Sequence, residues 1–416
     1  MSNDTQPEIR FPGFTDDWEE HKLKDIFDIH TDFVSNGSFQ ALKDNVKLYK
    51  TENYAYMIRL QDASNNWSGP WLYTDKQGFD FLSKSMVYKD DILMSDRGTI
   101  GKFFLVPQLD KPMTLSSNAV LLRSTKNDNN FIYYMLNTSN ISNQIIVRTT
   151  PGVQPMISKT EFKKINTRIP NIQEQQKIGS FFKQLDNTIA LHQRKLDLLK
   201  ETKKGFLQKM FPKNGAKVPE IRFPGFTEDW EQRKLGELGE VTTGKAFSST
   251  DFDNQGEYLV ITNKDISDSS KSQNVVTNRI NISDNETIQR YNLSGKNILV
   301  TMDGVNLGKS AIFSNSKALL AQRVGRIKSN QLEFIYQITS SNTFLSKMRM
   351  LSVGNAIKHI SLKQISDYSS LVPKDTTEQQ KIGAFFKQFD DIIALHQRKL
   401  DLLKETKKGF LQKMFV

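Results

Sequence analysis

Two long stretches of the chain place apolar residues at the alternating steps of three and four that mark one face of a helix. The first runs from Ile178 to Met210 and the second from Ile382 to Met414. Each stripe needs a partner helix, and the nearest available partner is the other stretch, which carries the same pattern in the same chain. The positions predicted to form the seam are Ile178, Phe182, Leu185, Ile189, Leu196 and Leu199 in the first stretch, and Ile382, Phe386, Phe389, Ile393, Leu400 and Leu403 in the second. His192 and Lys203 are polar seam positions, which we interpret as fixing the register.

The segments 21–172 and 233–376 lack such stripes. They contain short apolar or alternating runs broken by Gly, Asn, Asp and Ser, such as Tyr258–Ile261 and Asn297–Val300. These runs predict twisted, mostly antiparallel strands. Two further runs, at 131–136 and 334–338, are expected to be short helices. The pattern therefore predicts α+β units that alternate with long helices.

The chain also contains an internal duplication. Residues Pro7–Glu19 return as Pro219–Glu231 with a single change, and Glu174–Phe211 return as Glu378–Phe415 with four changes in 38 positions. The segments between these blocks share only traces of similarity. Near-identical frames therefore carry two different inserts, and we interpret the inserts as the parts that recognise a ligand.

Composition narrows the class of function. The 57 Lys and Arg exceed the 46 Asp and Glu by 11 among 416 residues, which favours a polyanion such as nucleic acid as the partner. The absence of cysteine excludes disulfides, cysteine zinc sites, iron–sulfur clusters and thiol nucleophiles, and the five histidines are too scattered for an obvious metal cluster. The sequence shows neither an apolar leader nor a run of about 18 apolar residues, so we expect a cytoplasmic protein with no membrane contact.

Three loops recur at corresponding places in the two inserts and are candidates for recognition. They are Arg59–Asp62 with Thr262–Asp265, the glycine turns Arg97–Lys102 and Asp303–Lys309, and Arg148–Gln154 with Arg349–Asn355. Arg, Lys, Asn and Gln can form paired hydrogen bonds with base edges, and Thr is an adaptable donor. The residues predicted to contact DNA are Arg59, Gln61, Arg97, Thr99, Lys102, Arg148, Thr149 and Gln154 in the first insert, and Asn263, Lys264, Asn306, Lys309, Gln322, Arg323, Arg349, Asn355 and Lys358 in the second.

No motif supports catalysis, so no catalytic or metal-binding residue is predicted. Gly304–Ser310 resembles a phosphate-binding loop but has three residues between its glycines where that motif requires four. A stand-alone nuclease is disfavoured because carboxylates such as Asp90, Asp91 and Asp303 form no convincing metal constellation with a lysine. One alternative from another class stays open, a non-catalytic adaptor whose paired domains bind proteins. Mobility of the purified assembly on random duplexes would separate the adaptor from a DNA-binding protein.

Several local motifs point to one family. They are the two tryptophan-containing openings Trp18–Leu23 and Trp230–Leu235, the Ala321–Val324 strand, and the Glu-Gln-Gln-Lys-Ile helix starts at 174 and 378. On these motifs the chain resembles, over nearly its whole length, the specificity subunits of type I restriction-modification systems. The repeated Ala-Leu-His-Gln-Arg-Lys-Leu-Asp-Leu-Leu-Lys helices at 190–200 and 394–404 are similar to the staphylococcal branch. The first insert departs from the second at Ser117–Val120, where the Gln-Arg pair is missing, so the resemblance implies DNA contacts less strongly there.

The resemblance implies an α+β fold with two pseudo-twofold-related target-recognition domains, each of mixed or antiparallel sheet plus short helices. Two long helices would separate these domains as an antiparallel coiled coil. The implied boundaries are 1–172 for the first target-recognition domain, 173–212 for the first spacer helix, 213–376 for the second target-recognition domain and 377–416 for the second spacer helix.

The resemblance also implies a function and partners. Each recognition domain would read one half of a bipartite site on double-stranded DNA, and the helices would set the spacing and dock two methyltransferase subunits. Restriction/translocase subunits would complete the assembly. The chain itself would be non-catalytic and hold no cofactor, because S-adenosylmethionine would be bound by the partner methyltransferase subunit.

Overall fold

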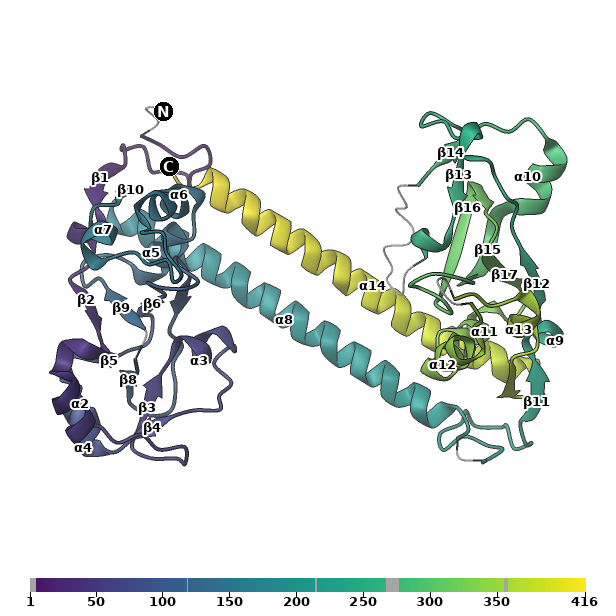
Figure 1. The fold of residues 1–416 in the computed structure, drawn as a ribbon, viewed down its shortest axis with the longest axis horizontal. Coiled ribbons are helices and arrows are strands. Elements are labelled where there is room, and N and C mark those ends of the chain that lie inside the picture. The colour runs from purple at the N-terminus through teal and green to yellow at the C-terminus, as the bar shows by residue number, and fades with distance from the viewer. Residues whose placement is uncertain (1–4, 118, 214, 267–276, 355–357) are drawn as a thin grey trace. The chain divides into compact units, whose positions relative to one another are not determined.

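The chain forms two compact units. The computed structural model describes residues 5–117, 119–213, 215–266, 277–354 and 358–416 (Figure 1). The first unit comprises Met1–His192 together with Leu400–Val416, and the second comprises Gln193–Lys399. Each long helix therefore contributes residues to both units.

The first unit is built from small sheets covered by short helices. Its strands are β1 (Glu19–Lys22), β2 (Ile29–Asp32), β3 (Ala55–Ile58), β4 (Tyr73–Thr74), β5 (Met86–Val87), β6 (Ile92–Met94), β7 (Phe103–Leu105), β8 (Met113–Leu115), β9 (Val120–Arg123) and β10 (Asn166–Ile169). Its helices are α1 (Leu23–Ile26), η1 (Phe33–Asn36), α2 (Phe39–Asn45), α3 (Leu60–Ser64), α4 (Lys76–Phe81), η2 (Ser83–Ser85), α5 (Asn129–Leu136), α6 (Ser139–Arg148), α7 (Lys159–Lys163) and the first part of α8 (Ile172–Met210). The sheets have the orders β2-β9-β6-β7, β4-β3-β8-β5 and β1-β10, and β3 pairs with β8 in parallel.

The second unit repeats this plan with longer strands. Its strands are β11 (Glu231–Lys234), β12 (Glu240–Thr243), β13 (Tyr258–Ile261), β14 (Arg279–Ile280), β15 (Asn292–Thr301), β16 (Ser310–Leu320), β17 (Val324–Lys328) and β18 (Ser369–Val372). Its helices are α9 (Leu235–Leu238), η3 (Ser249–Asp251), η4 (Asn263–Asp265), α10 (Asn285–Tyr291), α11 (Leu332–Thr339), α12 (Asn342–Leu351), α13 (Leu362–Ser366) and the first part of α14 (Thr376–Lys413). The order β12-β17-β15-β16-β13-β14 forms one sheet, and β11 pairs with β18.

The registers of the two units correspond strand by strand. Ile92 pairs with Leu122 between β6 and β9, as Ile298 pairs with Ile327 between β15 and β17. The parallel pair β3–β8 in the first unit likewise matches the parallel pair β13–β16 in the second. The first unit has two separate four-stranded sheets. In the second unit the corresponding strands form one sheet, because the long strands β15 and β16 extend through both regions.

The two short helices expected from the sequence are confirmed as α5 and α11. The Asp128 carboxylate accepts a hydrogen bond from the Phe131 amide at 2.7 Å and so caps the start of α5. Each of these helices buries its phenylalanine, Phe131 in α5 and Phe334 in α11.

The repeated blocks hold the core of each unit together. In the first unit the ring of Trp18 lies 5.8 Å from that of Phe131 and 6.2 Å from that of Phe415. In the second unit the ring of Phe211 lies 5.8 Å from both Trp230 and Phe334. Buried aromatic side chains dominate core energetics, since truncating one to alanine typically costs about 3–5 kcal/mol. The duplicated openings and helix ends therefore serve the same packing role in both units.

A glycine lies in each long helix where a helix of the insert approaches it. A Cβ atom at Gly179 would lie 2.8 Å from the amide nitrogen of Phe131, and a Cβ atom at Gly383 would lie 2.8 Å from that of Phe334. Only glycine permits this close approach. This explains why glycine occurs inside each long helix although it has a low helix propensity.

Within each unit, α8 and α14 pack antiparallel. In the second unit the Phe206 ring lies 5.2 Å from that of Phe385, while in the first unit the Phe181 ring lies 5.2 Å from that of Phe410. Polar pairs accompany these contacts, with Lys203 donating to Asp390 at 2.6 Å and Lys407 donating to Asp186 at 2.5 Å. The antiparallel arrangement expected from the family resemblance is thus present in each unit, and Lys203 has a partner that fits its interpretation as a register-fixing residue.

Burial divides the predicted seam positions into two groups. The buried ones are Ile178, Phe182, Leu196, Ile382, Phe386 and Leu400, and the half-buried ones are Leu185, Ile189, Leu199, Phe389, Ile393 and Leu403. Four of them, Ile178, Phe182, Ile382 and Phe386, also belong to the cores of the units and pack on the inserts. Across the described part of the chain, no helix combines the length and apolar character that crossing a membrane requires.

Candidate nucleic-acid interface

In the first unit the glycine turn and the third predicted loop lie together. The turn follows β6 and the loop follows α6. The Gly98 amide donates to the Pro155 carbonyl at 3.1 Å, and the Ile157 amide donates to the Asp96 carbonyl at 2.9 Å. Two of the three recurring loops therefore form one continuous surface.

The second unit joins the same two loops in the same way. The Ile360 amide donates to the Met302 carbonyl at 2.8 Å, and His359 forms bridges with both Asp303 and Val353. The corresponding bridges in the first unit join Met156 to Arg97 and to Thr150. One backbone arrangement thus presents Arg97 and Met156 in the first unit but Asp303 and His359 in the second.

A third segment completes this surface in the second unit. Gln322 and Arg323 connect β16 to β17, the Gln322 amide donates to the Lys245 carbonyl at 2.8 Å, and the Arg323 carbonyl accepts from the Met302 amide at 3.0 Å. The resulting recess has a volume of about 480 Å³ and is lined by Thr243, Gly244, Ala246, Met302, Gln322, Arg323, His359, Ile360 and Leu362. The sequence-predicted pair Gln322 and Arg323 therefore lines a recess together with residues that flank the glycine turn and the third loop, Met302 before the turn and His359 after the loop.

Gly244 packs closely against the backbone at the end of β16, directly before Gln322 and Arg323. A Cβ atom there would lie 2.1 Å from the Leu320 carbonyl oxygen and 2.3 Å from that of Ala321. These neighbours are backbone atoms that cannot rotate away, so a larger residue would displace the strand end that carries Gln322 and Arg323.

The first predicted loop is a capped helix start in both units. The Arg59 amide donates to the Asp62 carboxylate at 2.9 Å, and the Thr262 amide donates to the Asp265 carboxylate at 2.8 Å. The Arg59 guanidinium is also engaged, because its Nε and Nη2 atoms bind Asp62 at 3.0 and 2.5 Å. Helix capping therefore accounts for the recurrence of this motif in the two inserts.

The other predicted residues fall into exposed and engaged groups. The exposed ones are Gln61, Arg97, Thr99, Lys102, Gln154, Lys264, Gln322, Arg323, Arg349 and Lys358, whereas Asn263 and Lys309 are half-buried and Asn355 lies outside the described residues. Arg148 donates to the Gln144 carbonyl at 3.2 Å, Thr149 donates to the Ile145 carbonyl at 2.8 Å, and Asn306 donates to the Ile266 carbonyl at 3.4 Å. The side chains of this engaged group fasten loops to their own unit.

Arg97 keeps its charge beside an acidic neighbour. Its Nε atom donates to Asp96 at 3.2 Å, and this hydrogen bond raises the pKa of the Arg97 guanidinium above its ordinary value. The side chain is 54% exposed, so a cation remains at the surface of the turn.

Asp303 and His359 belong to the candidate interface but are absent from the DNA contacts predicted from the sequence, although Asp303 begins the predicted glycine turn. Asp303 is mostly buried, and its Oδ2 atom lies 3.5 Å from Nη1 of Arg323. Their positions follow from the pairing of the glycine turn with a loop more than 40 residues further along the chain. A short sequence motif does not reveal a pairing between segments so far apart in the chain.

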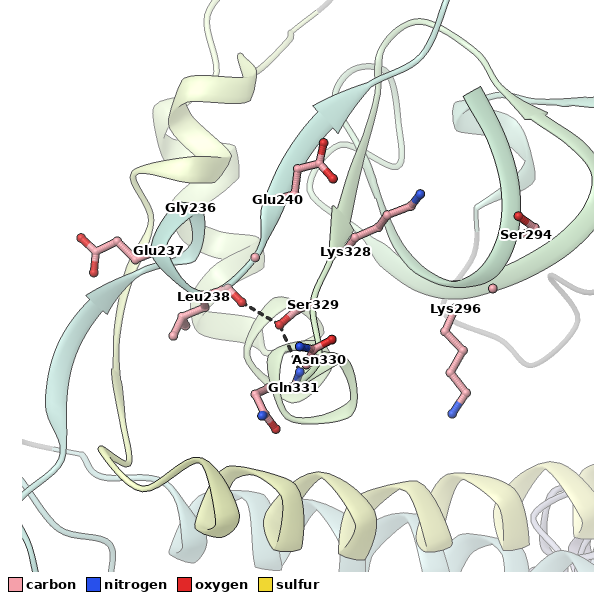
Figure 2. Close-up of a pocket in the computed structure, with 12 residues that line it drawn as sticks. Gly236, Glu237, Leu238, Glu240, Ser294, Lys296, Lys328, Ser329, Asn330 and Gln331 are labelled. Carbon is pink, nitrogen blue, oxygen red and sulfur yellow. Dashed lines mark hydrogen bonds between the residues drawn. The ribbon is translucent and has the colours of Figure 1, made fainter. Parts of the chain in front are cut away.

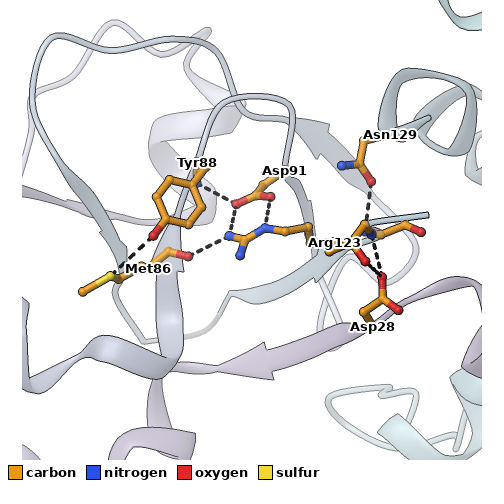
Figure 3. A network of polar contacts seen from close by, with 8 residues as sticks. Asp28, Met86, Tyr88, Asp91, Arg123 and Asn129 are labelled. Atoms are coloured by element: carbon orange, nitrogen blue, oxygen red, sulfur yellow. Dashed lines mark hydrogen bonds and ion pairs between the residues drawn. The ribbon is translucent and has the colours of Figure 1, made fainter. Parts of the chain in front are cut away.

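The carboxylates considered for a nuclease are held in ion pairs. Arg123 binds Asp91 through Nε and Nη2, both at 2.6 Å, and its guanidinium carbon lies 4.6 Å from the centre of the exposed Tyr88 ring (Figure 3). Asp90 pairs with Lys183 at 3.0 Å. Within the residues that the structure describes, no group of three or more His, Asp or Glu side chains could hold a metal ion.

A second, larger cavity of about 820 Å³ lies at the opposite end of β15 from the glycine turn (Figure 2). Its lining includes Lys296, Lys328 and Ser329. The Ser329 hydroxyl donates to the Leu238 carbonyl at 2.6 Å, and Lys296 pairs with Glu333 at 2.5 Å. Ser329 and Lys296 thus help to hold α9 and α11 to the sheet.

Comparisons with known proteins place this architecture in a family. The profile described as "Type I restriction modification DNA specificity domain" matches residues 15–201 and again 227–405. The chain therefore belongs to the family of type I restriction-modification DNA specificity subunits, and the membership predicted from its sequence motifs is confirmed.

Two archaeal relatives and one solved structure support this membership. The type I restriction enzyme MjaVIII specificity subunit of Methanocaldococcus jannaschii is 24% identical over 343 residues, 77% of each chain. A second specificity subunit from that organism is 24% identical over 421 residues and covers 95% of this chain and 92% of its own. The crystal structure of the type I restriction-modification S subunit from M. genitalium matches 99% of both chains with a TM-score of 0.67 at 15% identity. The last similarity shows the shared fold.

Neutralising Lys102 or Lys309 should weaken binding to all duplexes to a similar degree. A lysine that contacts a phosphate releases a counterion on binding, so its loss should flatten the dependence of log K on log salt by about one unit per contact. The measurement is a salt titration of affinity for a cognate and a random duplex with each lysine changed to alanine. Lys317→Ala, an exposed lysine of β16 paired with Glu257, is the matched control. A loss confined to the cognate duplex would reassign Lys102 or Lys309 to base recognition.

Proposed function

We propose that this chain is the non-catalytic DNA-binding subunit of a type I restriction-modification complex, and that each unit reads one half of a bipartite site. The observation that carries the proposal is the pair of matching turn-and-loop surfaces that present different side chains, Arg97 and Met156 in one unit and Asp303 and His359 in the other. Sequence is read by side chains at base edges, so one backbone frame with two sets of side chains suits two different half-sites. The net charge of +11 favours the DNA backbone as the common contact.

Methylome sequencing of a host that carries this chain with its partner subunits tests the proposal. The expected result is modified adenines in a two-part motif with a fixed unread spacer. Deletion of the gene for this chain should remove that motif and leave other methylation unchanged. Methylation that persists without the chain, or binding of the assembly to proteins but not to duplexes, would contradict the proposal and favour a protein-binding adaptor.

The two long helices are proposed to set the spacing between the half-sites. Helix α8 is continuous over 39 residues, which corresponds to a length of about 58 Å at 1.5 Å per residue. Lengthening the 174–211 helix should therefore change the number of unread base pairs and leave both half-site sequences unaltered. The methylome of a strain with the lengthened helix measures this number. An unchanged spacer would show that the helices do not set it.

The partners proposed for the helices are two methyltransferase subunits, with restriction/translocase subunits completing the assembly. Each unit carries one equivalent pair of exposed leucines, Leu191 and Leu402 in the first and Leu395 and Leu198 in the second, with exposed fractions of 59 to 67%. Four other apolar residues of these helices, Phe181, Leu207, Phe385 and Leu411, pack against the cores of the units. Two equivalent apolar pairs suit two copies of one partner, which would hold S-adenosylmethionine.

Replacing Leu198 and Leu395 together by aspartate should lower the number of bound methyltransferase subunits from two to one. The charged groups would lie in the apolar contact of one unit only, so the other unit should keep its partner. Native mass measurement of the co-expressed complex reads the stoichiometry directly. Val34→Asp, which changes an exposed valine on η1, serves as the control. A wild-type complex with one methyltransferase subunit, or methyl transfer by the isolated chain, would contradict this part of the proposal.

A further inference from the structure

Arg323 adopts a backbone conformation that side chains rarely take. Its φ is +65°, in the left-handed region where glycine is favoured, and it lies directly before β17. A residue other than glycine persists there when the surroundings hold it, and such residues cluster at binding sites. The hydrogen bond from the Met302 amide to the Arg323 carbonyl, at 3.0 Å, is one of the contacts that hold it.

The side chain of Arg323 is held by an ion pair that leaves some of its hydrogen-bond donors available. Its Nη1 atom lies 3.5 Å from Oδ2 of Asp303, and its side chain is 57% exposed whereas that of Asp303 is 15% exposed. Two other arginines provide a contrast, because Arg59 and Arg123 each use Nε and Nη2 in short paired bonds to a buried aspartate. In the ion pair with Asp303, the Nε and Nη2 atoms of Arg323 are not engaged.

The first unit lacks this device at the corresponding position. Ala119 precedes β9 as Arg323 precedes β17, and its side chain is buried. The turn position that holds Asp303 in the second unit holds Arg97 in the first, where it pairs with its own neighbour Asp96. The arrangement of Asp303 with Arg323 therefore belongs to the recognition surface of the second unit alone.

We propose that Arg323 reads a guanine in the half-site of the second unit, and that Asp303 is its positioning residue. This inference rests on the proposed function of the chain. The guanidinium offers two parallel N–H donors that match the N7 and O6 acceptors of guanine in the major groove. The Asp303 carboxylate lies 3.5 Å from the Nη1 atom, where the ion pair limits the directions the Arg323 side chain can take. A carboxylate near DNA repels phosphates, so its presence is explained by orientation of Arg323 and not by affinity.

The test uses the full chain co-expressed with its methyltransferase subunit and a pool of randomised duplexes. Selection with the wild-type complex gives the two half-sites. Arg323→Ala and Arg323→Lys should each lose the preference for one guanine in one half-site, with a fall of about 10- to 100-fold in affinity for the selected duplex and little change on a scrambled one. Replacing that guanine by 7-deazaguanine, which lacks the N7 acceptor, should weaken the wild-type complex and leave Arg323→Ala unaffected.

The positioning role of Asp303 has its own measurement. Asp303→Asn should lose the preference at that same guanine while its affinity for scrambled DNA stays equal or rises, since a negative charge has been removed. Combined with Arg323→Ala it should add no further loss, and Asp303→Glu should restore part of the preference. Glu286→Gln and Arg290→Lys, exposed residues of α10, are the matched controls for charge and side-chain type. Arg323→Gly should keep or raise the thermal midpoint of unfolding, because glycine suits a φ of +65°.

The experiment distinguishes a failure of the proposed function from a failure of the inference about Arg323. If the wild-type complex selects no sequence from the pool, the proposed function of the chain is wrong. If it selects a two-part site and the Arg323 and Asp303 variants keep every base preference, this inference is overturned. A loss of preference in Asp303→Asn that spreads over the whole half-site, with a lowered unfolding midpoint, would also overturn it, because Asp303 would then support the fold of the loop.

Discussion

Arg222→Ala is expected to destabilise the second unit by about 3–5 kcal/mol, because it leaves a buried carboxylate without its cation. The Arg222 guanidinium binds Glu378 through Nε at 2.7 Å and through Nη2 at 2.8 Å. Glu378 is only 1% exposed, so water cannot replace the lost donors. The hydrogen bond to Glu378 raises the pKa of the Arg222 guanidinium above its ordinary value, so the guanidinium keeps its charge. Urea unfolding followed by circular dichroism measures the loss.

The first unit provides an internal repeat of this experiment. Arg10 binds Glu174 through the same two atoms, both at 2.8 Å, and Arg10→Ala should destabilise the first unit to a similar degree. Lys213→Ala breaks an ion pair with Glu220 in which both side chains are about half exposed, and it should leave the unfolding midpoint unchanged. Equal effects of Arg222→Ala and Lys213→Ala would contradict the account of a buried pair.

Exchanging residues 21–172 for the insert of a homologous chain should change one half of the DNA site and leave the other half intact. On the original site the complex should lose about 10³-fold or more in affinity, which is the usual margin between specific and non-specific binding. The exchange spares the frame, because Arg10, Trp18 and Glu174 all lie outside it. Selection from randomised duplexes reads both half-sites in one measurement.

The reciprocal exchange of 233–376 is the control for this prediction. It should alter the other half-site only, and the spacer should stay constant in both hybrids. A hybrid whose two half-sites both change would show that the inserts do not act as separate readers. A hybrid that fails to fold would be recognised by its unfolding curve, and an insert that preserves the aromatic contact of Phe131 with Trp18 should then be used.

The long helices and the short helices α5 and α11 could be predicted because local periodicity and internal repetition in the sequence specify them. The stripes from Ile178 and Ile382 correspond to α8 and α14, and the apolar runs at 131–136 and 334–338 correspond to α5 and α11. Each of these elements is specified by neighbours within a few turns of the same helix. The duplication then indicated that both units share one plan.

The candidate nucleic-acid interface was only partly predictable because segments distant in the sequence form it. The sequence pointed to Gln322 and Arg323, but the Asp303–Arg323 pair depends on how the glycine turn meets the end of β16. His359 enters the surface through a bridge to Asp303 across 56 positions of sequence. Conversely, the Arg59 motif recurs for a local reason, the capping of a short helix, and pattern alone does not separate capping from recognition.

The packing of residues 400–416 in the first unit has a consequence for synthesis on the ribosome. Met414 is buried in the core of that unit, Phe415 packs on Trp18 and Phe131, and the Lys413 carbonyl accepts a hydrogen bond from the Ile9 amide at 2.9 Å. The second unit, Gln193–Lys399, contains all of its own residues before that segment is translated. The first unit is therefore translated first but completes its folding last. Its aromatic core lacks Met414 and Phe415 until residues 400–416 have been translated.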